Sequence, residues 1–151
     1  MAHVSDLFIA IERHKPMKRV EQAMAVADRG FDGCVHGRSG GKRQVLLVDG
    51  EALAEFGLTP GALRENITTT GLDLAALGAG HRLFIGNAVL EVTIPCEPCH
   101  RMDEIRIGLQ DALKDRRGVL CRVIEGGRIS RGDAIEVERV AETIPYPGGA
   151  R

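Results

Sequence analysis

The sequence predicts a β-rich (α+β) domain, folded as a closed β-barrel with a few short helices. Short apolar runs separated by glycine-containing turns recur along the chain, whereas helical patterns are few. Glycine is also frequent, with 19 copies in 151 residues, and the corners and bulges of a barrel need residues that tolerate positive φ. A parallel α/β sheet would instead need a crossover helix after each strand.

The expected strands are apolar or alternating runs bounded by turn-forming residues. They cover residues 7–12, 43–49, 82–86, 88–94, 119–124 and 134–138, with residues 128–132 leading into the last run. Gly86-Asn87 joins two of these runs and predicts a tight hairpin. In the last run Ile135 and Val137 alternate with glutamates, which predicts a half-buried strand.

Four short segments show helical patterns. They are Val20–Ala27, with Val20, Met24 and Ala27 on one side, Glu51–Phe56, which ends at Gly57, Ile105–Leu113, and a possible single turn at Leu72–Leu77. The Ile105–Leu113 segment places its large apolar residues on one face, as an amphipathic helix requires.

The length fits one domain, since domains usually have about 100–200 residues. We assign residues 1–140 to a single barrel domain and residues 141–151, which are rich in Pro and Gly, to a loose C-terminal tail. With 20 basic and 21 acidic residues the net charge is -1, so no bulk field attracts nucleic acid or an anionic membrane. Aromatic residues make up only 3%, so platforms for stacking bases are scarce.

The cellular setting is expected to be the cytoplasm. No apolar run approaches the ~18–20 residues that cross a bilayer, and the N-terminus lacks the order of a signal peptide. In a reducing compartment the four cysteines, Cys34, Cys96, Cys99 and Cys121, are expected to be thiols or ligands rather than disulfides.

The segment Cys96-Glu-Pro-Cys-His100 carries the most chemistry and admits several interpretations. As C-x-x-C-H it matches a c-type haem attachment site, and as C-x-P-C between a strand and a helix it matches a thioredoxin-type redox pair. With two further ligands, from Cys34, His36, His100 or Cys121, it would form half of a zinc site. It can also present one soft thiolate to a metal or carry sulfur, or it can be a pair in a turn with no role.

Four ordered segments together resemble the MOSC domain, the family named for the C-terminal domain of molybdenum-cofactor sulfurase. The segments are residues 33–37 leading into 43–47, 64–69 with 71–74, 80–86 with 90–93 and Pro98-Cys99, and 118–123 with 126–133. They span roughly residues 4–138. The chain departs from many members at Gly33-Cys34, where those members have Gly-Asp.

The resemblance implies a β-barrel with a cysteine at the end of its long strand. In the family this cysteine is thought to carry sulfur or to ligate molybdenum. Cys99 matches that position better than Cys96, which remains an alternative, and we take Cys99 as the metal ligand. His100 can assist proton transfer beside it, although a solvated histidine is the simpler interpretation.

The resemblance also implies a pocket for the molybdenum cofactor (molybdopterin), a pterin with a dithiolene and a phosphate. Such a pocket needs cations, amide donors and a soft ligand. The candidate residues are Arg43, Gln44, Arg64, Asn66, Thr68, Thr69 and His36. The glycine-rich basic stretch 33–42 can wrap a phosphate or be a flexible loop. Residues 66–69 can bind the cofactor or form an ordinary turn. Arg117 can line the pocket or be a cation at a helix end.

The implied function is sulfur transfer, or reduction of N-oxygenated compounds, through a cysteine thiolate or persulfide. The chain has no pyridoxal-phosphate domain, so sulfur or electrons would come from a desulfurase or an electron-donor protein acting on a small-molecule ligand. Whether the protein is a molybdenum-dependent oxidoreductase, a sulfurtransferase or no enzyme stays open. The alternatives are a non-catalytic sulfur-relay or interaction module and a small zinc-stapled β domain.

Overall fold

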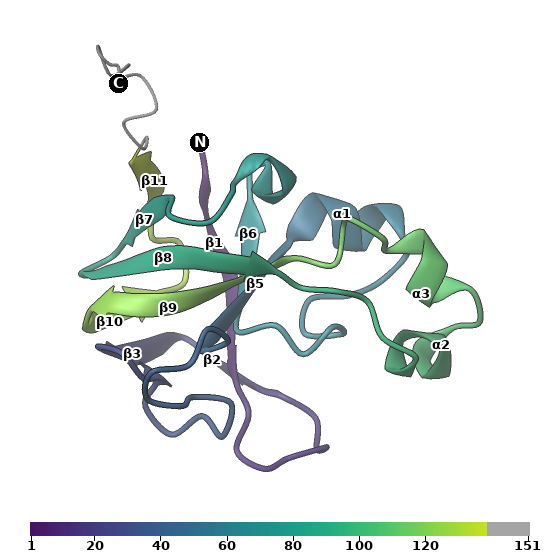
Figure 1. Cartoon of the computed structure of the whole chain (residues 1–151), viewed down its shortest axis with the longest axis horizontal. Coiled ribbons are helices and arrows are strands. Elements are labelled where there is room, and N and C mark those ends of the chain that lie inside the picture. Colours follow the sequence, from purple (N-terminus) through teal and green to yellow (C-terminus); the bar gives the residue numbers. More distant parts are fainter. Residues whose placement is uncertain (139–151) are drawn as a thin grey trace, which may run out of the picture.

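The computed structural model describes residues 1–138, and Figure 1 shows their path. The predicted tail at residues 141–151 lies outside the described residues. The strands are β1 (His3–Ile9), β2 (Lys18–Val20), β3 (Gln22–Val26), β4 (Gly30–Phe31), β5 (Val45–Asp49), β6 (Ile67–Thr70), β7 (Arg82–Ile85), β8 (Ala88–Pro95), β9 (Val119–Glu125), β10 (Gly127–Ser130) and β11 (Ile135–Glu138). The helices are α1 (Gly50–Glu55), α2 (Arg101–Ile105) and α3 (Leu109–Ala112), with one 3-10 turn at Leu74–Ala76.

The strands form two sheets, and the prediction of a closed barrel is wrong. One sheet has eight strands in the order β11-β7-β8-β9-β5-β6-β1-β2, and the other has three in the order β10-β3-β4. The start of β1 approaches the segment before β11 through one isolated bridge, His3 to Ala134, but β2 and β11 remain unpaired edges of the described sheet. Frequent turns and glycines suit two curved sheets as well as a barrel, because neither specifies which edges pair.

The predicted hairpin is confirmed. β7 pairs antiparallel with β8, with Ile85 opposite Ala88 across the Gly86-Asn87 turn. β8 then pairs with β9, and β9 with β5, so the long strand that precedes Cys96 lies inside the large sheet. β7 pairs with the first half of β8 only, whereas β9 pairs with it as far as Pro95, so the segment after β8 is anchored at its start by β9.

The helix predicted at Val20–Ala27 is wrong, because this segment forms the end of β2 and all of β3. Ala23 and Ala25 are buried while Met24 is exposed, which is the alternation of a strand. Pairing with β10 and β4 overrides the helix propensity of Ala and Met. The segment Ile105–Leu113 is also not one helix, since Gly108, at φ 90°, separates α2 from α3.

Strand β5 is buried on both faces and separates two hydrophobic clusters. Val45 and Leu47 face the cluster enclosed by the sheets. Leu46 and Val48 face a second cluster, which contains Cys96 together with residues of the helices. A strand covered on both sides needs a continuous apolar run, which the sequence at 45–48 supplies.

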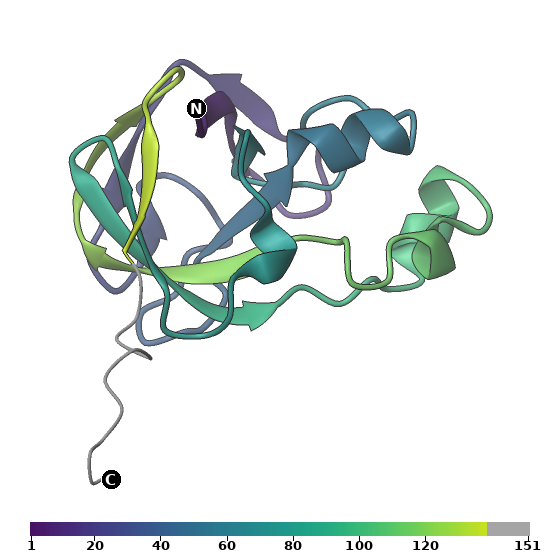
Figure 2. The ribbon, with the colours of Figure 1, turned by 90° about the horizontal axis from the view of Figure 1, so that it is seen from above.

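The helices α1, α2 and α3 lie together on one side of the strands, and Figures 1 and 2 show this from two directions. Asp49 caps α1 by accepting the backbone N–H groups of Glu51 and Ala52. Over residues 1–138, no helix has the length and apolar character that crossing a membrane requires.

Candidate anion-binding site

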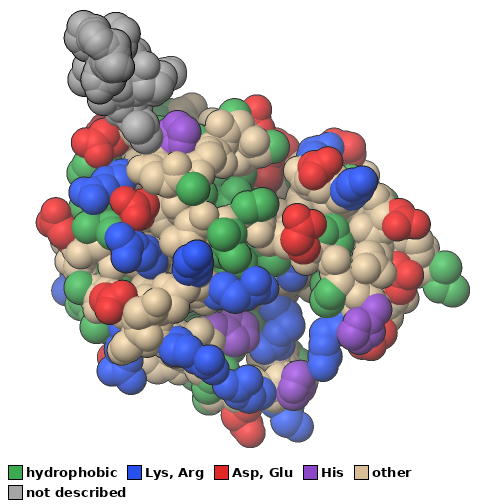
Figure 3. Space-filling model, in the orientation of Figure 1, with side chains coloured by type: hydrophobic (Ala, Val, Ile, Leu, Met, Phe, Trp, Pro, Cys, Tyr) green, Lys and Arg blue, Asp and Glu red, His purple; other side chains and the backbone are tan. Residues whose placement is uncertain are grey.

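A pocket of about 490 Å³ lies between the loops that connect the strands and the segment after β8. Its lining residues are Arg13, Val35, His36, Arg38, Gly41, Lys42, Arg43, Leu46, Leu63, Arg64, Asn66, Cys96, Arg117 and Leu120. Figure 3 shows Lys, Arg and His side chains gathered around a hollow between the main body and the helical part. Apolar side chains form part of the wall, and the polar groups are nearly all cationic.

The pocket is strongly basic. Six of its lining residues are Arg or Lys, and a seventh is His36. Within the described part of the chain, no Asp or Glu lines it. Like charges brought together in this way repel one another, and a bound anion relieves that repulsion. The composition of the wall therefore selects a negatively charged ligand.

Five separate chain segments build this wall, and one of them is the segment after β8, which carries Cys96. Arg13 comes from the loop after β1, and residues 35–43 come from the loop before β5. Residues 63–66 lead into β6, and Arg117 stands just before β9. Such a site is hard to find in the sequence, because its members are spread from residue 13 to residue 117.

Arg117 is the least exposed cation in the wall. Only 8% of the residue is accessible. Its Nη2 donates to the carbonyl oxygen of Leu63 at 2.9 Å. Its Nε and Nη1 are buried and find no hydrogen-bond partner within residues 1–138. A buried guanidinium with two unused donors is costly unless a ligand accepts from them.

Cys96 brings a thiol into the same pocket. Its backbone N–H donates to the carbonyl oxygen of Gly118 at 2.9 Å, so it is held beside the start of β9. The residue is 8% exposed. Burial raises the pKa of the Cys96 thiol, while the nearby Arg117 and Arg43 guanidinium groups oppose that rise. An anionic sulfur at this place would be stabilised by those two cations.

Arg64 and His36 meet at the pocket wall. Nη2 of Arg64 lies 3.4 Å from Nε2 of His36. Burial, followed by the charges of Arg64 and Arg13, lowers the pKa of His36. The neutral ring can accept from Arg64, whereas a protonated ring would repel it. Arg64 adopts φ 60°, a left-handed conformation that is uncommon for a residue with a side chain.

Asn66 lines the pocket, but its side chain is used by the backbone around it. Its Oδ1 accepts the N–H of Leu46 at 3.0 Å, and its Nδ2 donates to the carbonyl oxygen of Phe8 at 3.2 Å. These bonds join β1 to β5 just before β6 begins. The predicted binding residue thus has a clear role in holding the wall together.

Three other predicted binding residues lie outside the pocket lining. Gln44 is buried, donates to Asp28 and to the carbonyl oxygen of Arg38, and accepts the N–H of Val123 at 2.9 Å. Thr68 donates to Glu65 at 2.7 Å, and Thr69 is fully buried. Both threonines belong to strand β6 rather than to the expected loop.

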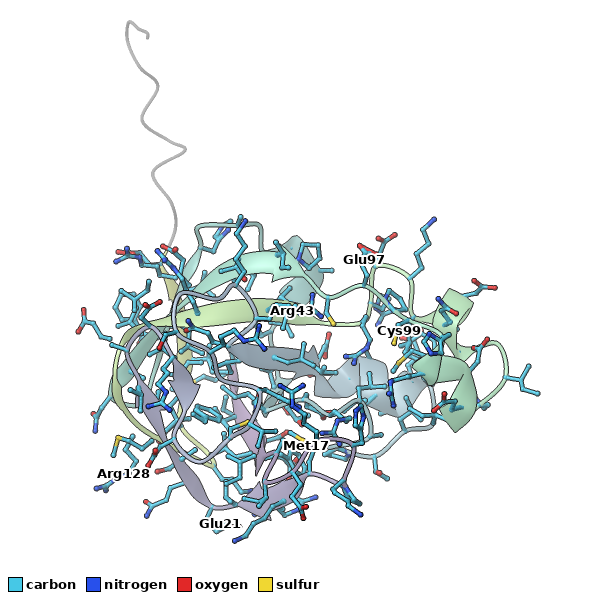
Figure 4. All side chains as sticks on the ribbon, turned by 60° about the horizontal axis from the view of Figure 1, so that its bottom comes forward. Met17, Glu21, Arg43, Glu97, Cys99 and Arg128 are labelled. Carbon is cyan, nitrogen blue, oxygen red and sulfur yellow. The ribbon has the colours of Figure 1, made fainter. Side chains whose placement is uncertain are left out.

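Cys99 and His100 are exposed and do not line the basic pocket. Figure 4 shows Cys99 beside the helices, on the segment between β8 and α2, with Arg43 nearer the strands. His100 is the N-cap residue of α2, without a side-chain capping bond. The two cysteines of the C-x-x-C segment therefore differ: Cys96 faces the pocket and Cys99 faces solvent.

The remaining cysteines are buried away from this segment. Cys121 and Cys34 belong to the cluster between the sheets, whereas Cys96 belongs to the other cluster. The Cys34 sulfur accepts the N–H of Ala10 at 3.4 Å. In the described residues no three side chains of His, Cys, Asp or Glu gather as metal ligands. The zinc-stapled alternative therefore gains no support from the arrangement of these residues.

A second pocket, of about 450 Å³, adjoins the other side of Cys96. Its charged lining residues are Asp49, Asp73, Glu97, Asp115 and Arg116. Cys96 lines both pockets, so this residue borders a basic compartment and a largely acidic one.

The site and the fold together define a small β-rich domain with a cationic, thiol-containing pocket. Residues 35–136 match the MOSC domain. This match spans well over half of the chain, and the protein belongs to the MOSC domain family, which is associated with molybdenum cofactor binding and sulfur transfer. None of the curated proteins matches the sequence.

Solved structures share the fold. The YuaD protein from Bacillus subtilis is 22% identical, with a TM-score of 0.75 over 90% of this chain and 94% of that one. YiiM from Geobacillus stearothermophilus is 18% identical, with a TM-score of 0.74 over 92% of this chain and 76% of that one. YiiM from Escherichia coli is 22% identical, with a TM-score of 0.72 over 94% and 72%. At these identities the likeness shows the fold alone.

Five of the site residues that the sequence predicts lie in one pocket, whose lining also contains residues that the sequence does not mark. Arg43, Arg64, Asn66, His36 and Cys96 all line the basic pocket. Arg13 was not singled out, because nothing in residues 10–17 marks a binding loop. The sequence allows Arg117 to be either a pocket residue or a cation at a helix end. The burial that distinguishes Arg117 is a property of the folded chain.

Proposed function

We propose that the basic pocket binds the molybdenum cofactor, with the cations holding its phosphate and a cysteine thiolate facing its metal. The observation that carries this proposal is Arg117, a buried guanidinium with two unpartnered nitrogens beside a pocket-lining thiol. A phosphate or another oxyanion supplies the acceptors that Nε and Nη1 lack. A thiolate is a ligand that suits a soft metal.

The residues present fit such a group. The pocket volume of about 490 Å³ lies within the ~300–1,000 Å³ typical of cofactor and ligand sites. Arg117, Arg43 and Arg64 would hold the anionic part, and Leu63 and Leu120 offer apolar surface. When bound, the cofactor supplies a centre that can exchange two electrons or take up sulfur.

Cys96 supplies the thiol in this proposal, because it lines the pocket and lies near Arg117 and Arg43. The family resemblance favours Cys99 as the metal ligand, and variants of both positions decide between them. The two arginines favour ionisation of Cys96, against the effect of burial, which raises the pKa of its thiol. The surrounding leucines limit access of water to the sulfur.

The direct test is metal and pterin content after expression in cells with intact cofactor synthesis. We expect molybdenum and pterin to copurify with the wild type, and both to fall in Arg117→Met. Cys96→Ser is expected to lose molybdenum while keeping part of the pterin, and Cys99→Ser to keep both. Loss of molybdenum only in Cys99→Ser would assign the metal ligand to Cys99, and a wild type without either component would overturn the proposal.

A further inference from the structure

We propose that Cys99 and Cys96 act as a two-station sulfur relay, in which the exposed thiol takes sulfur from a donor protein and passes it inward to the pocket thiol. This inference rests on the proposed function, since it concerns how sulfur reaches the same pocket. The geometry that supports it is the contrast between the two positions: Cys99 is exposed, and Cys96 is 8% exposed and lines the basic pocket.

Access explains why two thiols are needed. A donor that carries a persulfide on its own cysteine must bring its sulfur into contact with the acceptor. Cys96 is 8% exposed and shares the pocket wall with Leu63, Leu120 and Arg117, so a persulfide on another protein reaches it less readily than it reaches an exposed thiol. Cys99, three residues further along the chain and beside the helices in Figure 4, is exposed, so such a donor can reach it.

The spacing allows the two sulfurs to meet. Both ends of the segment are anchored, since Cys96 donates its N–H to Gly118 and the carbonyl oxygen of Cys99 accepts the N–H of Met102 at 2.9 Å. Three residue steps span at most about 11 Å between Cα atoms, and a C-x-x-C segment brings sulfurs together in dithiol proteins. The relay therefore requires the Cys99 side chain to turn toward the pocket.

The chemistry balances without an external oxidant or reductant. The Cys99 thiolate attacks the outer sulfur of the donor persulfide, an S–S bond forms on Cys99, and the donor cysteine leaves as a thiolate. The Cys96 thiolate then attacks the outer sulfur on Cys99, so the S–S bond to Cys96 forms while the bond to Cys99 breaks. The proton of Cys96 moves to the released Cys99 sulfur, and the transferred sulfur keeps its oxidation state.

The pocket favours the inward direction. A persulfide is more acidic than its thiol, so sulfur on Cys96 is held as an anion. Arg117 and Arg43 lie near that position, and Arg117 has unused donors. Cys99 lies outside the pocket lining and lacks this support. The cationic wall therefore stabilises the second persulfide more than the first.

The test follows sulfur on each cysteine of the full chain. The chain is incubated with a cysteine desulfurase and cysteine, trapped with iodoacetamide at successive times, digested, and measured by tandem mass spectrometry, in which fragmentation between residues 96 and 99 assigns the added sulfur to one cysteine. In the wild type we expect added sulfur on Cys99 first and on Cys96 later. In Cys99→Ser the labelling of Cys96 should slow at least tenfold, and in Cys96→Ser the label should remain on Cys99.

Three results would overturn the relay. In the first, Cys96 is labelled as fast in Cys99→Ser as in the wild type. In the second, the label appears on Cys96 before it appears on Cys99. In the third, a Cys96–Cys99 disulfide forms and sulfide is released. Thermal unfolding of each variant confirms that it folds, and Cys34 and Cys121 serve as internal unlabelled controls. Molybdenum content of the same preparations separates the two proposals: ordered labelling in a chain that never takes up molybdenum would leave the relay standing and remove the cofactor.

Discussion

The backbone N–H of Cys96 donates to the carbonyl oxygen of Gly118 at 2.9 Å. This single bond joins the segment after β8 to the segment before β9. Because Arg117 precedes Gly118, the bond also places a buried cation beside a buried thiol. The pairing of two neighbouring strands thus continues beyond their ends and assembles the reactive part of the pocket.

Replacing Arg117 with methionine should weaken anion binding without weakening the fold. The variant loses charge-assisted hydrogen bonds, each worth about 1.5–3 kcal/mol, so phosphate or molybdate should bind about tenfold to hundredfold less tightly. It also removes a buried charge with two unused donors, and the melting temperature should stay equal or rise. Titration calorimetry and thermal unfolding measure the two effects, and unchanged anion affinity would contradict the assignment.

The adjacent threonines of β6 offer a matched pair of variants. Thr68 donates to the buried Glu65 carboxylate at 2.7 Å, whereas the Thr69 hydroxyl has no partner in the described structure. Thr68→Val should cost about 1.5–3 kcal/mol of unfolding free energy, because it removes a bond to a charged group. Thr69→Val should be neutral or stabilising, because it removes a buried hydroxyl without a partner. Equal losses in urea unfolding would contradict this difference.

His36 should make stability depend on pH. Burial and the neighbouring cations lower its pKa below the ordinary value of 6.5 in the folded state. The unfolded chain therefore takes up the proton first as the pH falls. The contribution of the neutral His36 ring to the free energy of unfolding is fully present above pH 6.5. It is lost as the pH falls through the lowered pKa of the folded state.

The comparison that isolates this effect uses His36→Gln, which cannot titrate. Its melting temperature should fall less than that of the wild type between about pH 7.5 and pH 5. His100→Gln, at an exposed position, is the control and should follow the wild type. Parallel pH curves for wild type and His36→Gln would refute the prediction.

The four thiols should react in three classes. Cys99 is exposed and should modify first with a disulfide reagent. Cys96 should follow more slowly, because burial keeps its pKa raised. Cys121 is fully buried, and the Cys34 sulfur accepts hydrogen bonds from Ala10 and Asn66, so these two thiols should react only on unfolding. Loss of the fast phase in Cys99→Ser, followed spectroscopically, checks the order, and a fast phase that persists in this variant would contradict it.

Gly118 should not tolerate a side chain. It adopts φ 118°, and a Cβ atom there would lie 2.4 Å from the carbonyl oxygen of Leu47. Gly118→Ala should cost at least about 2 kcal/mol of unfolding free energy and should displace Cys96 from Arg117. Gly78→Ala is the control, because its added Cβ meets no described atom within 4 Å. Similar stability of both variants would disprove this.

Local patterns predicted the elements that depend on local interactions. The hairpin of β7 and β8, the apolar strand β5 and the short helix α1 all lie where the sequence placed them. The prediction failed where distant pairing decides the outcome. Residues 22–26 form a strand because β10 and β4 pair with them, and closure into a barrel depends on edges far apart in the chain.

The site was predictable in type but not in membership. A thiol near cations was expected, and the pocket contains both. The direction of the chain after Pro95 decides which cysteine faces inward. The orientation of β5 and β6 decides which polar residues in or beside these strands face the pocket. Gln44 and Thr68 are used in bonds that no local pattern reveals, and the Thr69 hydroxyl is buried without a partner in the described structure.

The position of Cys96 between two pockets gives its surroundings a built-in polarity. Arg117 and Arg43 line one of the two pockets that share Cys96, and Asp115 and Glu97 line the other. A zwitterionic molecule reaching across the sulfur would be turned by this field, its negative end toward the arginines and its positive end toward the carboxylates. A molecule that approaches Cys96 at the end of β8 would thereby have one preferred orientation.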